Sequence, residues 1–256
     1  MPKTTIEKKE VYYEIHGTGA PVIMLHGFLE SLTMWHYYAK DLSKTHQVIL
    51  IDLPGHGRTE VFPEHHMDDM AKVVFKVLDH LGVENAPIIG HSMGGYVALA
   101  MADQKPELKQ KILLFFSSAA ADTPEKKINR ERLKSIVKDN KEIFSRHAIP
   151  MLFTSKTRAL FKPVIDQLIE EAIAMDTNGI TKTIDGLKLR PNREHVLENT
   201  SVSFISGKLD EAVPFDSLTQ QHKAKGVEKV WVTENGHMGH IEDRDYCLAA
   251  IQEFLA

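Results

Sequence analysis

Short apolar runs recur along the first half of the chain. The clearest are residues 21–27 (PVIMLHG), 48–55 (VILIDLPG) and 111–117 (KILLFFS), and a further strand is predicted over 11–15 (VYYEI). Continuous apolar runs of this length are typical of strands that are buried on both faces. The pattern therefore predicts a sheet with layers of helices on both sides.

Helical periodicity lies between these runs. One apolar stripe has the i, i+3, i+4 spacing of a helix face, and Gly82 follows it as a stop signal; its members are Met67, Met70, Val74, Val77 and Leu81. Strand patterns return at 201–207 and 229–233, and a final helix closes the sequence. Strands that alternate with helices predict an α/β fold with a mostly parallel central sheet flanked by helices.

The alternation is interrupted between residues 122 and 196, where only helical patterns occur. One helix is predicted to start at the DTPE segment, with Pro124 in its first turn. A second is predicted from an apolar stripe that ends near residues 178–179; its members are Phe161, Ile165, Leu168, Ala172 and Met175. We therefore expect a core domain made of residues 1–121 and 197–256, with a helical insertion at 122–196.

Composition narrows the possible functions. The formal net charge of the 256 residues is −4, which gives no reason to expect nucleic acid or an anionic membrane as a partner. No apolar run approaches the ~20 residues of a membrane span, and the first ten residues show no signal-peptide pattern. The single cysteine, Cys247, excludes an internal disulfide and suits a reducing compartment, so we expect a cytoplasmic protein.

A serine stands at an abrupt change of pattern. Residues 86–89 have the pattern of a strand and residues 97–102 that of a helix, and Gly-His-Ser-Met-Gly at 90–94 lies between them. This G-x-S-x-G arrangement predicts a nucleophile elbow with Ser92 at its tip. The alternatives are a glycine turn with an incidental serine, or a phosphate-binding loop. The stretch lacks the Lys-Ser/Thr ending of a P-loop, which argues against nucleotide binding.

A serine hydroxyl needs a base, and the sequence offers fourteen histidines. His237 is the preferred candidate because it follows the last strand pattern, at the sheet edge where ligands of open α/β sheets bind. His240 is the competitor, and its alternative role is to brace the same loop. His91 adjoins Ser92 but is expected to point away from it at a sharp turn.

The base in turn needs an acid to orient it. Asp210 lies in the loop that follows the strand pattern 201–207 and is the preferred candidate. Glu211 is adjacent and competes with it, and Asp122 is another loop carboxylate at the same predicted edge.

Five segments together resemble the α/β-hydrolase superfamily, in particular its serine esterase and lactonase-like branch with a helical lid. They are LHGFLES (25–31), DLPGHGRT (52–59), IGHSMGG (89–95), SGKLDEAVP (206–214) and NGHMGHIED (235–243). Their order is the family's order, with nucleophile, acid and base following one another along the chain. The resemblance implies that residues 122–196 are a lid. It also implies an oxyanion hole made of the backbone N–H groups of Phe28 and Met93.

These features predict a serine hydrolase that cleaves a small ester, a lactone or a related carbonyl compound through an acyl-enzyme. A carbon–carbon hydrolase, a cofactor-free haloperoxidase-like protein and a ligand receptor with little turnover remain alternatives. The serine argues against the dehalogenases and epoxide hydrolases of this fold, which use an aspartate nucleophile. No cofactor is expected, and no metal either, because the histidine pairs lack the spacing of a zinc site.

The insertion is expected to hold the determinants of substrate choice. It carries 15 Lys and Arg against 11 Asp and Glu, a net charge of +4, which fits either an anionic substrate or, more simply, a solvated face. Phe161 and Ile165 are candidates for the substrate pocket, with packing against the core domain as the alternative.

Overall fold

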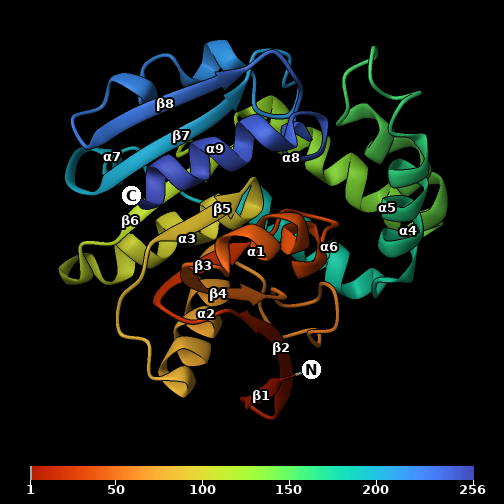
Figure 1. The fold of residues 1–256 in the computed structure, drawn as a ribbon. Helices are drawn as coiled ribbons and strands as arrows, with labels where there is room; N and C mark the ends of the chain where they lie inside the picture. Colours follow the sequence, from red (N-terminus) through yellow and green to blue (C-terminus); the bar gives the residue numbers. More distant parts are fainter. Residues whose placement is uncertain (1) are drawn as a thin grey trace.

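An eight-stranded sheet forms the centre of the computed structural model, which describes residues 2–256 (Figure 1). The strands are β1 (Lys3–Ile6), β2 (Lys9–His16), β3 (Ala20–Leu25), β4 (His46–Ile51), β5 (Ile88–His91), β6 (Lys111–Phe115), β7 (Ser201–Gly207) and β8 (Val227–Thr233). Their order is β1-β2-β4-β3-β5-β6-β7-β8. Strands β3 to β8 run parallel, whereas β2 is antiparallel to β4 and β1 to β2. The loops that follow the parallel strands therefore open at one edge of the sheet.

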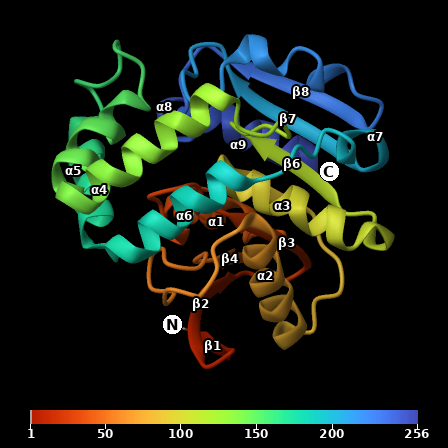
Figure 2. The ribbon, with the colours of Figure 1, turned by 180° about the vertical axis from the view of Figure 1, so that it is seen from behind.

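Helices cover both faces of the sheet. One face packs against α1 (His36–Leu42) and α9 (Arg244–Leu255), and the other against α2 (Met67–Leu81) and α3 (Met93–Gln104) (Figures 1 and 2). Neighbouring strand residues such as Met24 and Leu25 join the cores on opposite faces, as the pleat of a strand requires. The short elements are η1 (Leu32–Trp35), η2 (Pro106–Leu108), α7 (Val196–Asn199), η3 (Phe215–Leu218), η4 (Gln221–Lys223) and α8 (Gly239–Glu242).

The predicted strands and the helix ending before Gly82 are confirmed, with bounds shifted by up to a few residues. Helix α2 spans the predicted stripe, and Gly82 ends it in the left-handed region at φ +68°. The strand β1 and the helix α1 were not predicted. β1 has four residues and α1 seven, so neither is long enough to show a clear periodicity.

The segment between residues 122 and 196 contains three long helices, α4 (Pro124–Met151), α5 (Lys162–Ala174) and α6 (Thr177–Leu189). The predicted start at Pro124 is confirmed, because Thr123 caps α4 by accepting a hydrogen bond from the N–H of Lys126. The predicted end of the second helix is too late. Helix α5 ends at Ala174, and Asp176 caps the next helix, so residues 178–179 lie in the first turn of α6.

These three helices stand at one side of the sheet, on the right in Figure 1 and on the left in Figure 2. Their inward faces form an apolar cluster, which the sheet domain joins with the buried side chains of Leu29, Met238 and Ile241 and the partly buried side chain of Phe28. The insertion thus packs onto the loops at the carboxyl edge of the sheet. No helix within residues 2–256 is both long enough and apolar enough to cross a membrane.

Candidate active site

Ser92 occupies the sharp turn between β5 and α3. Its backbone angles are φ 48° and ψ −110°, a strained combination for a residue other than glycine. The turn brings α3 against β3 and β5 so closely that side chains are excluded on both sides of the serine. A Cβ atom on Gly90 would lie 2.4 Å from the carbonyl carbon of Gly94, and one on Gly94 would lie 2.2 Å from the carbonyl oxygen of Leu25. The glycines of the motif therefore serve the close approach of backbones.

Hydrogen bonds hold the backbone of the turn on both sides of Ser92. Its N–H donates to the carbonyl of Phe115 at 3.0 Å, and its own carbonyl accepts from Ser117 Oγ at 2.7 Å. Met93 is the first residue of α3, so its N–H has no acceptor within the helix. The positive end of the helix dipole therefore lies beside the serine, where it favours negative charge.

His237 and Asp210 are paired beside this turn. His237 Nδ1 lies 2.8 Å from Asp210 Oδ2, and both side chains are buried. The other carboxylate oxygen of Asp210 accepts from the N–H groups of Ala212 and Val213, each at 2.8 Å. A carboxylate held in this way fixes the imidazole with Nδ1 protonated. The lone pair of Nε2 is then left to accept a proton.

Two influences on the pKa of His237 oppose each other. Burial is the larger single influence and lowers the pKa, but the charge and the hydrogen bond of Asp210 together outweigh it. The net effect raises the pKa of His237 above its ordinary value of 6.5. The imidazole is thus poised to hold a proton more firmly than an isolated histidine does.

The competing candidates are placed differently. Glu211 is exposed, and Asp122 is already bound by two guanidinium groups, those of Arg130 and Arg190. His240 is 2% exposed, and neither of its ring nitrogens makes a hydrogen bond within residues 2–256. Burial lowers the pKa of His240 to about 3, so this ring stays neutral. Its backbone carbonyl accepts from the hydroxyl of Tyr38 at 2.8 Å, which braces the loop.

A cavity of about 110 Å³ lies over the turn, and Ser92 and His237 both line it. Phe28, which follows β3, and Met238 contribute from neighbouring loops. The fold therefore brings Ser92, Asp210 and His237 into one small region. Along the chain, the first and last of them are 145 residues apart.

Two buried side chains fix the loop that carries Phe28. His26 Nδ1 lies 2.8 Å from the carbonyl oxygen of Gly27, while its Nε2 accepts from the N–H of Leu53 at 2.9 Å. Burial lowers the pKa of His26 to about 4, which agrees with a neutral ring in this role. The N–H of Gly27 donates to Glu30 Oε2 at 2.7 Å, and a Cβ atom on Gly27 would lie 2.5 Å from that oxygen.

Glu30 and His91 form a buried pair behind the turn, which the sequence analysis did not identify. His91 Nδ1 lies 2.7 Å from Glu30 Oε2, and its Nε2 lies 3.2 Å from the carbonyl oxygen of His237. A carboxylate and a carbonyl both accept hydrogen bonds, so each ring nitrogen of His91 faces an acceptor. Burial alone would raise the pKa of Glu30, but the charge and the hydrogen bond of His91 lower it to about 2. The sequence signal that could have revealed this pair is Glu30 itself, a charged residue within the segment LHGFLES.

The two substrate-pocket candidates belong to the apolar cluster of the insertion. Ile165 is buried in the apolar cluster of the insertion, and Phe161 packs against the same cluster. Neither is among the residues of the described chain that line the cavity at Ser92. Within 122–196 the cavity is lined instead by Arg130 and Leu152 of the α4 region and by Leu187 of α6.

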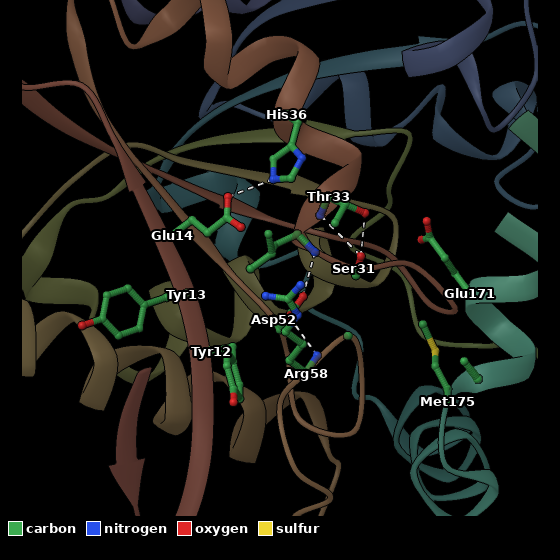
Figure 3. A pocket seen from close by; sticks show the side chains of 13 residues that line it. Tyr12, Tyr13, Glu14, Ser31, Thr33, His36, Asp52, Arg58, Glu171 and Met175 are labelled. Carbon is green, nitrogen blue, oxygen red and sulfur yellow. Dashed lines mark hydrogen bonds and ion pairs between the residues drawn. The ribbon is translucent and has the colours of Figure 1, made fainter. Parts of the chain in front are cut away.

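A second cavity, of about 350 Å³, lies between β2, η1 and the end of α5 (Figure 3). Its acidic groups are already engaged. Glu14 Oε2 lies 2.9 Å from His36 Nε2, and Asp52 accepts from the N–H groups of Leu32 and Arg58 at 2.8 Å and 2.9 Å. Ser31 Oγ accepts from the N–H of Thr33 and caps η1. Ser31 and the His36–Glu14 pair line this cavity, but Ser31 Oγ lies 2.7 Å from Thr33 Oγ1 and caps a short helix. Ser92 instead stands at a strained strand–helix turn beside the buried pair of His237 and Asp210, so the cavity at Ser92 is the better candidate for catalysis.

Two groups of side chains place possible metal ligands within 4.8 Å of one another: Glu14 with His16 and His36, and Glu30 with His91 and His240. In the first group both imidazoles face the same carboxylate oxygen, at 2.8 Å and 2.9 Å. In the second, His91 Nδ1 faces Glu30. A metal ion at either place would have to displace protons that these hydrogen bonds use.

The sequence profile of the alpha/beta hydrolase fold matches residues 20–149, about half of the chain, including the turn at Ser92. The chain belongs to the alpha/beta hydrolase family. The eight-stranded, mostly parallel sheet and its helical layers are the fold of that family. The fold class and the family resemblance predicted from the sequence are thus confirmed.

Individual alpha/beta hydrolases are similar to this one over most of its length. A pimeloyl-[acyl-carrier protein] methyl ester esterase of Yersinia enterocolitica is 30% identical, over 80% of this chain and 81% of that protein. The solved structure of a thermophilic esterase from Thermogutta terrifontis superposes with a TM-score of 0.89 at 27% identity, covering 99% of this chain and 96% of the other. An enol-lactonase from Burkholderia xenovorans LB400 shares the fold, with a TM-score of 0.90 at 20% identity and 99% of each chain covered.

Several other curated relatives are matched over only part of their own length. The chain spans 62% of the length of an acetyltransferase component of an acetoin cleaving system from Pseudomonas putida, at 27% identity over 90% of this chain. It spans 46% and 43% of two further hydrolases, from Azorhizobium caulinodans and Bacillus subtilis. The activities of those whole proteins therefore do not transfer to this chain by similarity alone.

Proposed function

We propose that this alpha/beta hydrolase is a serine hydrolase of small carboxylic esters, including cyclic esters, that works through an acyl-enzyme. Ser92 Oγ attacks the carbonyl carbon while its proton passes to Nε2 of His237. The bond to the alcohol oxygen then breaks, and His237 returns the proton to the departing alcohol. Water next attacks the acyl-enzyme while His237 takes one of its protons. The bond between the acyl carbon and Ser92 Oγ then breaks, and His237 returns the proton to that oxygen, which leaves the carboxylic acid and the free serine.

One observation carries this proposal: Ser92 and His237 line one small cavity, and His237 is held from behind by Asp210 at 2.8 Å. The strained turn aims a nucleophile at the cavity, and the pair beside it supplies a base of raised pKa. Asp210 keeps the imidazole in the tautomer that accepts at Nε2 and stabilises its cation after proton transfer. The reaction uses only groups of this chain and water.

We also propose that the N–H groups of Phe28 and Met93 receive the oxyanion of the tetrahedral intermediate. Phe28 lines the same cavity as Ser92, and Met93 follows Ser92 as the first residue of α3. A developing negative charge gains there from the helix dipole as well as from the two donors. The loop of Phe28 is fixed in advance by His26 and Glu30, so little reorganisation accompanies the reaction.

Residues 122–196 are, in this proposal, the lid of the site, and residues 1–121 and 197–256 the catalytic core. The support is twofold. The helices of the insertion share an apolar cluster with only a few side chains of the core. They also supply three of the side chains that line the cavity, Arg130, Leu152 and Leu187. Substrate choice would then depend on both parts of the chain.

The test is covalent labelling. A fluorophosphonate probe reacts with an activated serine, so the wild type should take up one label and Ser92→Ala none. Ser135→Ala, which changes an exposed serine on α4, serves as the matched control and should label like the wild type. Mass spectrometry locates the label, and hydrolysis of p-nitrophenyl acetate should disappear together with it.

Two outcomes would contradict the proposal. Equal labelling of Ser92→Ala would place the nucleophile elsewhere. A wild type that labels but shows no steady-state turnover on a panel of short esters and lactones would indicate a ligand receptor instead.

A further inference from the structure

Arg130 brings a guanidinium group into the wall of the cavity that holds Ser92 and His237. It lies on α4, eight residues after Asp122, and its Nε donates to Asp122 Oδ2 at 3.1 Å. This is its only hydrogen bond within residues 2–256. A guanidinium has five N–H donors in one plane, so four of them remain for a ligand.

Asp122 does not neutralise the positive charge around it. Its side chain is fully buried, and its second oxygen accepts from Arg190 at 2.7 Å, so two guanidinium groups share one carboxylate. Lys126, one turn before Arg130, donates to a carbonyl oxygen, that of Ala212, at 3.2 Å and finds no acidic partner there. The lid side of the cavity therefore carries more positive than negative charge.

The carboxylates on the core side do not offset this excess. Glu30 lines the cavity, but it is paired with His91 at 2.7 Å, and Asp210 is paired with His237 at 2.8 Å. Oε2 of Glu30 is engaged by His91, and Asp210 lies behind His237 and is not among the described residues that line the cavity. An anion entering the cavity meets Arg130, because neither Lys126 nor Arg190 is among the described residues that line it. The side chain of Arg130 is 23% exposed, whereas that of Arg190 is 5% exposed.

We propose that Arg130 is a carboxylate-binding residue and that the preferred substrates are short esters that carry a free carboxylate. The planar guanidinium matches the two oxygens of a carboxylate, which gives orientation as well as attraction. The ester carbonyl is then held at Ser92 while the charge is held at Arg130. The small volume of about 110 Å³ restricts the compounds to a few carbon atoms between the two groups. This inference rests on the proposed function and names its substrate class.

Matched ester pairs test the proposal. Monomethyl succinate carries its carboxylate on the acyl side, O-acetylglycolate carries it on the alcohol side, and dimethyl succinate and methyl acetoxyacetate are the neutral counterparts. We expect the wild type to show a KM about tenfold lower for at least one anionic ester than for its neutral counterpart, with the preference reduced by added salt. Whichever anionic ester is preferred shows whether Arg130 lies nearer the acyl group or the alcohol group of the bound substrate.

The variants locate the effect. In Arg130→Gln the KM values for the anionic and the neutral ester should become equal. Arg130→Lys should keep part of the preference, because a lysine retains the charge but not the planar pair of donors. Arg132→Gln changes an exposed arginine of the same helix and should leave the ratio as in the wild type. Binding of the same esters to Ser92→Ala, measured by calorimetry, gives a readout that needs no turnover, and there Arg130→Gln should remove the preference too.

Two results would overturn the inference. One is an equal KM for both members of each pair in the wild type while the neutral esters are hydrolysed, which would leave the proposed serine hydrolase intact. The other is a preference for the anionic ester that persists in Arg130→Gln, which would assign the carboxylate to another residue. Loss of labelling at Ser92 would contradict the proposed function instead, and calorimetry would still decide the role of Arg130.

Discussion

His91 Nδ1 and Glu30 Oε2 lie 2.7 Å apart in the interior of the protein, and their side chains are 1% and 6% exposed. The pair connects two loops that meet at the proposed active site. Glu30 also accepts from the N–H of Gly27, and His91 also faces the carbonyl of His237. Both the loop of the proposed oxyanion donor Phe28 and the loop of the proposed base are therefore held by one ion pair.

The first prediction is that Glu30→Gln destabilises the protein by about 3 kcal/mol, because it removes the charged partner of the buried His91 side chain. We expect kcat to fall more than KM rises, since the loop of Phe28 loses its anchor. Urea unfolding measures the stability. Glu64→Gln, at an exposed glutamate, is the control and should change the free energy of unfolding by less than about 0.5 kcal/mol.

A double-mutant cycle distinguishes a specific pair from general disruption. His91→Gln removes the other partner, so the combined variant should lose at least about 1 kcal/mol less than the sum of the two single losses. Strictly additive losses would show that the two side chains act independently.

The second prediction separates the two histidines of the last loop. His237→Ala should lose nearly all of kcat, whereas His240→Ala should keep most of it, because His240 is buried behind the site and held neutral at a pKa of about 3. Combining His237→Ala with Ser92→Ala should cost no more than the worse single change, since the two groups act as a unit. Steady-state kinetics on p-nitrophenyl acetate give the comparison, and an inactive His240→Ala beside an active His237→Ala would reverse the assignment.

The third prediction concerns pH. His237 must be neutral to accept the proton of Ser92, so kcat/KM should fall as the pH drops through its pKa, which lies above 6.5. In Asp210→Asn the negative charge is gone and burial dominates, so this acidic limb should move to lower pH. The same change should reduce kcat on the order of 10⁴-fold, because the imidazole loses its tautomer and orientation.

Glu211→Gln is the matched control for that experiment, since it neutralises the exposed carboxylate next in the sequence. It should change neither the limb nor kcat by more than about twofold, because exposed charges are screened by solvent. A shifted limb in Glu211→Gln together with an unshifted one in Asp210→Asn would exchange the roles of the two acids.

The fourth prediction tests the close packing at the turn. Gly94→Ala should cost more than about 3 kcal/mol, because the new Cβ atom would lie 2.2 Å from the backbone oxygen of Leu25 and the helix would have to move. Gly82→Ala introduces the same methyl group where nothing lies within 4 Å, so only its left-handed backbone at φ +68° opposes it, at about 1 kcal/mol. Equal costs in urea unfolding would show that α3 can shift without penalty.

The fifth prediction concerns the lid. Leu152→Ala enlarges the cavity at Ser92, so the acyl chain length that gives the highest kcat/KM should increase. Phe161→Ala removes a side chain that packs in the lid cluster and does not border the cavity, so it should lower the free energy of unfolding without moving that optimum. A series of p-nitrophenyl esters measures the profile, and a shift in Phe161→Ala alone would return that residue to the pocket.

Local sequence patterns determined the main elements and the chemistry they carry. In a helix or a strand, the repeat of the backbone decides which nearby residues lie on the same face. Apolar runs and helical stripes reflect this local rule, so they can be recognised in the sequence. The helix Met67–Leu81 was predictable for this reason. The helix start at Pro124 was predictable because proline fits the first turn of a helix. The turn at Ser92 was predictable as well, because its glycines are needed by the turn itself. The pairing of His237 with Asp210 was expected from the edge of the sheet where both loops emerge.

Only the tertiary structure decided what each buried side chain contacts. An apolar stripe containing Phe161 and Ile165 shows that the helix has a buried face, but the stripe is the same whether that face meets a substrate or other helices. Glu30 and His91 are 61 residues apart, and no local period relates them, so their ion pair could not be read from spacing. Arg130 likewise lines the cavity only because the helices of the insertion pack over the sheet domain. Such contacts depend on how distant elements pack, and therefore on the fold as a whole.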